Sequence, residues 1–139
     1  MTKRLVVIIV LFAFSCCCKA QDLLVKHADV PQYPQLAIQA RLSGTLRFHV
    51  TIKAGTVTGI EPDADNPPNL RILADAALSN IRGWSFYDEK AVFDVEFIYE
   101  ISRQEVVVPE NPRIELNLPH SVKLIASPVK PTVNYEQHQ

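Results

Sequence analysis

The fold is decided by the stretch TLRFHVTIKAGTVTGI, which spans residues 45–60. In residues 45–53 every second residue is apolar, namely Leu46, Phe48, Val50 and Ile52. A period of two over this length is typical of a strand with one buried and one solvent-exposed face. A turn follows at residues 54–55, because glycine tolerates positive φ, and a second β-prone run begins after it. The stretch predicts an antiparallel hairpin, which needs other elements to cover its apolar face.

Two amphipathic segments are expected to supply that cover. Pro34 suits the first turn of a short helix, and Gly44 is expected to act as its left-handed cap. Asn69 is expected to cap a second helix that Gly83 ends. The apolar residues of this second helix recur with a period of 3.6. They are Leu70, Leu73, Ala74, Ala77, Leu78 and Ile81.

The longest alternating run, residues 91–101, predicts the third strand. The order of elements indicates an α+β fold of the type α-β-β-α-β, with a small three-stranded antiparallel sheet and helices on one face. If the third strand pairs beside the first, it forms an edge whose N–H and C=O groups lack partners.

The ends of the chain differ in composition from this domain of residues 31–101. Residues 102–139 hold five of the ten prolines and form a proline-rich extension, in which Ile114–Leu118 and Val122–Ala126 predict a small extra hairpin followed by a loose tail. Residues 1–20 have the anatomy of a secretory signal peptide, with an apolar run shorter than the roughly 20 residues that span a bilayer. Lipidation at Cys16 and an uncleaved anchor are the alternatives, and residues 21–30 are a polar lead-in.

Composition and motifs argue against several functions. The net charge of −1 gives no indication of nucleic acid or of an acidic membrane surface as a partner. No nucleophile elbow, phosphate-binding loop or zinc motif occurs, so we expect no catalytic residue, metal or cofactor. His49 is interpreted as a surface histidine, and Asp94, Glu96 and Glu100 as a solvated strand face.

Several short motifs, in this order and at this spacing, resemble the C-terminal domain of TonB-type energy transducers. The resemblance runs from Pro31 to Ile101. The motifs are Tyr33-Pro34 with Ala37, Gly44, Gly55-Thr56-Val57, Ala76-Ala77, Trp84-Ser85-Phe86 and the strand Phe93–Phe97.

The resemblance implies a non-enzymatic domain in the periplasm or cell envelope of a Gram-negative bacterium. Its partner would be an extended peptide, the TonB box of an outer-membrane receptor, added as a strand beside the last strand of the domain. Carried over to this chain, the contact residues would be Ala91, Val92, Phe93, Asp94, Val95, Glu96 and Phe97, with a second contact segment at Gln32, Tyr33 and Pro34.

The chain also departs from the pattern of that family. Tyr87-Asp88-Glu89-Lys90 stands where a Pro-Gly often follows the aromatic motif, and only ten residues separate Ala20 from Pro31. Ten extended residues span about 35 Å, far less than a periplasm. The short spacer argues against energy transduction from the inner membrane. A second hypothesis, motivated by the two alternating segments that follow the expected edge strand, is an envelope adaptor or structural module without energy transduction. In this hypothesis the C-terminal extension covers the edge strand and the domain self-associates.

Overall fold

The central hairpin forms as predicted in the computed structural model, which describes residues 23–132. β2 (Gly44–Lys53) and β3 (Thr56–Pro62) pair antiparallel. The turn residues Ala54 and Gly55 both have positive φ, at 54° and 74°. Two consecutive positive φ values give the turn a twist that matches the flanking strands. The signal-peptide prediction for residues 1–20, including Cys16, lies outside the described residues.

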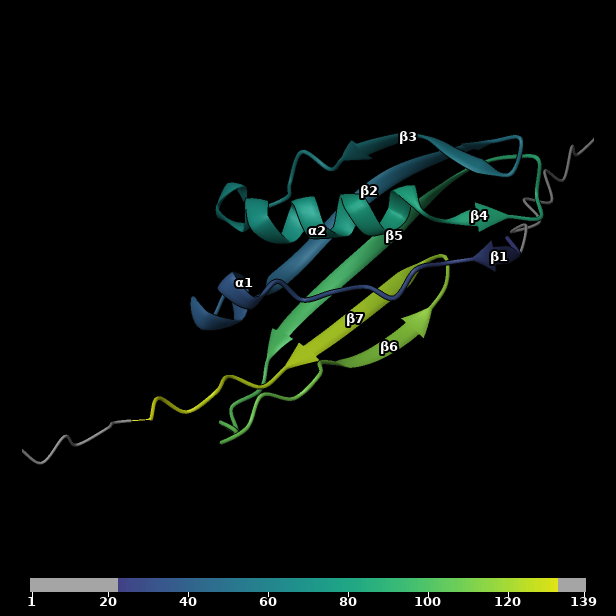
Figure 1. Cartoon of the computed structure of the whole chain (residues 1–139). Helices are drawn as coiled ribbons and strands as arrows, with labels where there is room; N and C mark the ends of the chain where they lie inside the picture. Colours follow the sequence, from purple (N-terminus) through teal and green to yellow (C-terminus); the bar gives the residue numbers. More distant parts are fainter. Residues whose placement is uncertain (1–22, 133–139) are drawn as a thin grey trace, which may run out of the picture.

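The predicted three-stranded antiparallel sheet is wrong, because within residues 23–132 the sheet has seven strands and is mixed (Figure 1). Their order is β1-β4-β3-β2-β5-β7-β6. β5 (Lys90–Ile101) lies between β2, with which it is antiparallel, and β7 (Ser121–Ala126), with which it is parallel. β6 (Arg113–Asn117) completes this end by pairing antiparallel with β7. The predicted C-terminal hairpin therefore exists, but it is part of the main sheet.

The other end of the sheet is built from two short strands. β4 (Ser85–Phe86) continues the chain after Trp84 and pairs with the start of β3. β1 (Val25–His27) pairs with β4, with Val25 opposite Phe86. Part of the predicted polar lead-in is therefore a strand, because the side chain of Val25 packs against the core.

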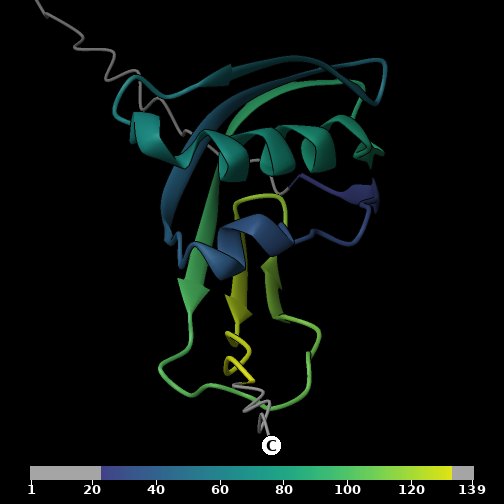
Figure 2. The ribbon, with the colours of Figure 1, turned by 60° about the vertical axis from the view of Figure 1, so that its left-hand side comes forward.

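Both helices lie on the same face of the sheet (Figures 1 and 2). They are α1 (Gln35–Gln39) and α2 (Arg71–Arg82), the latter preceded by the 3₁₀ turn η1 (Pro68–Leu70). Most apolar-face residues of the predicted strands are buried beneath these helices, and Phe48 and Phe97 are fully buried, whereas Ala91 and Ile101 at the ends of β5 are only partly buried. Trp84 is 2% exposed and its ring stacks on that of Phe97, as expected for a residue where helix meets sheet. No helix within residues 23–132 is both long and apolar enough to cross a membrane.

The helix caps differ in part from the prediction. Asn69 lies inside η1, and the residue before α2 is Leu70, which makes no side-chain capping bond. Gly83 does end α2. The left-handed residue after α1 is Arg41, with φ of 52°, rather than Gly44. A Cβ at Gly44 would lie 2.4 Å from Cδ1 of Leu70, so the Leu70 side chain would have to shift to accept one.

Candidate functional site

The outer edge of β5, predicted to bind a partner's strand, is half closed by β7. The pairing with β7 covers Glu96 to Ile101. At its two ends the N–H of Glu96 donates to the carbonyl of His120 at 2.9 Å, and the N–H of Ser102 donates to that of Ala126 at 2.7 Å. Glu96 and Phe97, two of the predicted contact residues, therefore lie in a stretch that has a strand on each side.

β7 is an integral strand of the core. Val122 and Leu124 are fully buried and Ala126 is 1% exposed. Removing a large apolar side chain from such a position forfeits about 1.5–3 kcal/mol of burial free energy. Displacement of β7 would lose this burial and six ladder positions together, so β7 is not a loose cover on β5.

The first half of β5 keeps an open edge. The groups that bond to β7 belong to even-numbered residues of β5, and the regular pairing with β2 keeps this alternation back to Lys90. The N–H and C=O groups of Val92 and Asp94, and those of Lys90 at the start of the strand, therefore point away from β2. Within residues 23–132 these groups make no hydrogen bond on that side. Val92 is 74% exposed, so both backbone and side chain are accessible.

Asp94 is also tied to a histidine on the uncovered face of the sheet. Nδ1 of His49 is hydrogen-bonded to the carboxylate of Asp94, and Nε2 lies 3.4 Å from Oδ2 of Asp63. The hydrogen bond with Asp94, followed by the charge of Asp94, raises the pKa of His49 above its ordinary value. His49 is exposed, as predicted, and its partners are set by the strand register, which places it opposite Asp94.

Of the second predicted contact segment, Gln32, Tyr33 and Pro34, only Tyr33 is buried in the core. Tyr33 is 6% exposed, its ring meets that of Tyr99 edge to face at 5.1 Å, and its hydroxyl donates to the carbonyl of Leu42 at 2.5 Å. Burial raises the pKa of Tyr33 to about 12. Tyr99, on which Tyr33 packs, lies six residues beyond Phe93 along β5, a distance of about 20 Å. The structure therefore does not bring this segment beside the open half of β5.

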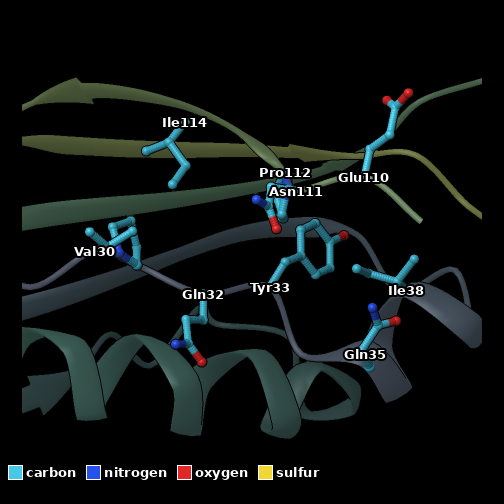
Figure 3. Close-up of a pocket in the computed structure, with 10 residues that line it drawn as sticks. Val30, Gln32, Tyr33, Gln35, Ile38, Glu110, Asn111, Pro112 and Ile114 are labelled. Atoms are coloured by element: carbon cyan, nitrogen blue, oxygen red, sulfur yellow. The ribbon is translucent and has the colours of Figure 1, made fainter. Parts of the chain in front are cut away.

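Gln32 and Tyr33 instead line a groove together with the C-terminal hairpin (Figure 3). The groove has a volume of about 470 Å³. One wall comes from Val30 and the start of α1, and the other from Glu110 to Ile114 at the entrance to β6. That residues 110–114 line a groove was not predicted from the sequence. The alternating run that begins at Ile114 was the sequence feature that pointed to a strand there.

The chain matches the family described as Gram-negative bacterial TonB protein C-terminal over residues 29–102, which are 74 of its 139 residues. The chain belongs to this family. No curated protein matches it. TonB C-terminal domains are non-catalytic protein-interaction domains of the Gram-negative envelope, and outer-membrane receptors are among their partners.

The TonB family match separates two parts of the structure. It covers α1, β2, β3, α2, β4 and β5 and ends at Ser102, one residue after β5. The hairpin β6–β7 lies wholly outside it. The strand on the outer side of β5 is therefore supplied by a part of this chain that the TonB family match does not include.

Proposed function

We propose that the chain is a non-enzymatic, TonB-like domain that binds an extended segment of another envelope protein by strand addition and so serves transport across the outer membrane. The observation that carries the proposal is that the pairing of β5 with β7 begins only at Glu96, which leaves the backbone groups of Val92 and Asp94 open. The partner strand would lie in line with β7, beyond the turn at His120. An outer-membrane receptor is the partner that family membership favours.

The open edge is short, and this limits the number of backbone hydrogen bonds that a partner strand can make. In strand addition, main-chain hydrogen bonds supply affinity and side chains on alternate positions supply selectivity. Val92 and Asp94 offer at most four such hydrogen bonds, and Lys90 at the start of the strand adds at most two. The side chain of Val92 lies on the uncovered face, where a neighbouring apolar residue of the partner would contact it. We therefore expect weak, reversible binding.

The proposal is tested by titrating the isotopically labelled chain with TonB-box-like peptides and following backbone NMR shifts. Shifts are expected at Lys90–Val95 and at His120. Val92→Pro removes the outward N–H without removing a bond to β2, and it should abolish the shifts. Val92→Thr, which keeps the N–H and suits a strand, is the matched control and should retain them. Shifts that cluster elsewhere would contradict the proposal.

A second candidate is the closed envelope adaptor, in which no peptide adds to β5 and energy is not transduced. The observation that favours it is the burial of Val122 and Leu124, which fixes β7 against Glu96–Ile101. In the same titration this candidate predicts no shift along β5 at any peptide concentration. Binding at Lys90–Val95 would exclude it.

A further inference from the structure

β6 is the outermost strand at its end of the sheet, and no described segment lies beyond it (Figure 1). The carbonyls of His120 and Ala126 bond to β5, so the even-numbered residues of β7 face β5 and the odd-numbered ones face β6. The residues opposite those odd positions are Arg113, Glu115 and Asn117. The backbone groups of Ile114 and Leu116 therefore point outward.

The side chains of β6 alternate between apolar residues on one face of the sheet and polar residues on the other. Ile114 and Leu116 stand opposite the buried Leu124 and Val122, so they lie on the helix-covered face of the sheet. Leu116 is 55% exposed and Val30, across the groove, is 73% exposed. A strand that adds here needs apolar residues at alternate positions on this face and polar residues on the other. β6 has this pattern itself.

We propose that the chain forms a two-fold symmetric dimer in which β6 pairs antiparallel with β6 of a second copy, with Ile114 opposite the partner's Ile114. In this register Arg113 stands opposite Glu115 of the partner subunit, and Glu115 stands opposite the partner's Arg113. Within one subunit Nη2 of Arg113 already lies 3.1 Å from Oε1 of Glu115. The four side chains would form a cluster of alternating charge on the uncovered face.

The charges disfavour the registers one step away from this one, and they disfavour parallel pairing. Antiparallel pairing centred on Glu115 places two carboxylates directly opposite each other, and in-register parallel pairing opposes like charges at both positions. Like charges directly opposite destabilise a strand pair, whereas opposite charges stabilise it. Pro112 has no N–H, so the register centred on Ile114 offers four backbone hydrogen bonds. Because so short an edge buries less surface than a stable dimer needs, we expect a concentration-dependent dimer.

This proposal is independent of the proposed function, because it uses β6 and leaves the open half of β5 free. Charge reversal tests it by sedimentation of the purified chain. Arg113→Glu opposes carboxylates with carboxylates, and Glu115→Arg opposes guanidinium groups with guanidinium groups. Each single variant is expected to sediment as a monomer at concentrations where the unaltered chain dimerises. An equimolar mixture of the two variants, and the double variant R113E/E115R, should form dimers again.

The controls separate this interface from other effects. Glu61→Arg reverses an exposed charge on β3, away from β6, and should leave dimerisation unchanged. Circular dichroism melting should show that every variant is folded. The proposal is overturned if the unaltered chain stays monomeric up to its solubility limit. It is equally overturned if both single variants dimerise like the unaltered chain, or if their mixture stays monomeric.

Discussion

At the residue scale, Asn80 holds three segments together. It is 8% exposed, and both atoms of its side-chain amide are used. Nδ2 donates to the carbonyl of Asp29 at 3.0 Å, and Oδ1 accepts from the indole N–H of Trp84 at 3.0 Å. This pairing allows Trp84 to be buried with its only donor satisfied. It also fixes the chain before α1 against the end of α2.

Replacing Asn80 should therefore be costly to stability. Asn80→Leu leaves the buried indole N–H of Trp84 and the part-buried carbonyl of Asp29 without these partners, and one unsatisfied buried group costs about 1–3 kcal/mol. We expect the free energy of unfolding, measured in urea, to fall by about 2 kcal/mol or more. Ser79→Leu, at the exposed neighbouring position, should stay within about 0.5 kcal/mol of the unaltered chain. Equal losses in the two variants would contradict this account.

His49 makes a second residue-scale prediction, on pH. Its pKa is raised in the folded chain by Asp94 and Asp63, so the protonated form is favoured by folding. The stabilising contribution is fully present below the ordinary pKa of about 6.5 and is lost as pH rises through the higher folded value. The difference in melting temperature between the unaltered chain and His49→Gln should shrink as pH rises from 5 to 9.

The histidine titration can be followed directly by NMR. In Asp94→Asn the pKa of His49 should move back toward its ordinary value, because the main cause of its shift is removed. An unchanged titration in this variant would show that Asp94 is not the cause.

At the element scale, β5 is one strand with two different outer edges. Glu96 to Ile101 are paired with β7, and Lys90 to Val95 are not. We expect hydrogen exchange to divide the strand. The outward N–H groups of Val92 and Asp94 should exchange much faster than those of Ile98 and Glu100, which bond to β7. The N–H groups of Phe93 and Val95 bond to β2 and should stay protected. Equal protection along the even-numbered residues would show that something covers the whole edge.

A separate prediction concerns how much the packing of β7 contributes to the stability of the fold. Leu124 is fully buried, whereas its neighbour Ile125 is only partly buried and faces the other way. Leu124→Ala should lower the free energy of unfolding by about 2–5 kcal/mol. Ile125→Ala should cost clearly less. If β7 were a removable flap, Leu124→Ala would leave the global unfolding transition unchanged.

At the scale of the whole molecule, the hairpin that lies outside the TonB family match shares one sheet and one core with the rest. Its Val122 and Leu124 belong to the same buried cluster as Phe97 and Tyr33. A chain truncated after Ser102, where the family match ends, exposes that cluster along β5. We expect it to lose the cooperative thermal transition of the full chain, as followed by circular dichroism. A truncated chain that melts as sharply as the full one would show that the hairpin is an appendage.

The sequence alone determined the pieces of this protein. The alternation from Leu46 to Ile52, the turn at Ala54-Gly55, the helix ending at Gly83, the strand from Ala91 and the hairpin around Pro119 were all predictable. Each depends on residues close together in the chain, through side-chain period or turn chemistry. The motifs also indicated the TonB family, which the comparison confirmed.

Only the tertiary structure decided which pieces are neighbours. Nothing near Phe97 in the sequence indicates that Val122 lies beside it. The alternating pattern of each strand predicts one buried face, and this pattern is the same whichever strand is the neighbour. The choice is made by burial: Val122 and Leu124 leave water by packing along β5, and this closes the outer edge of β5 from Glu96 to Ile101. The same packing restricts the open part of β5 to the stretch before Glu96 and leaves β6 as the new outer edge.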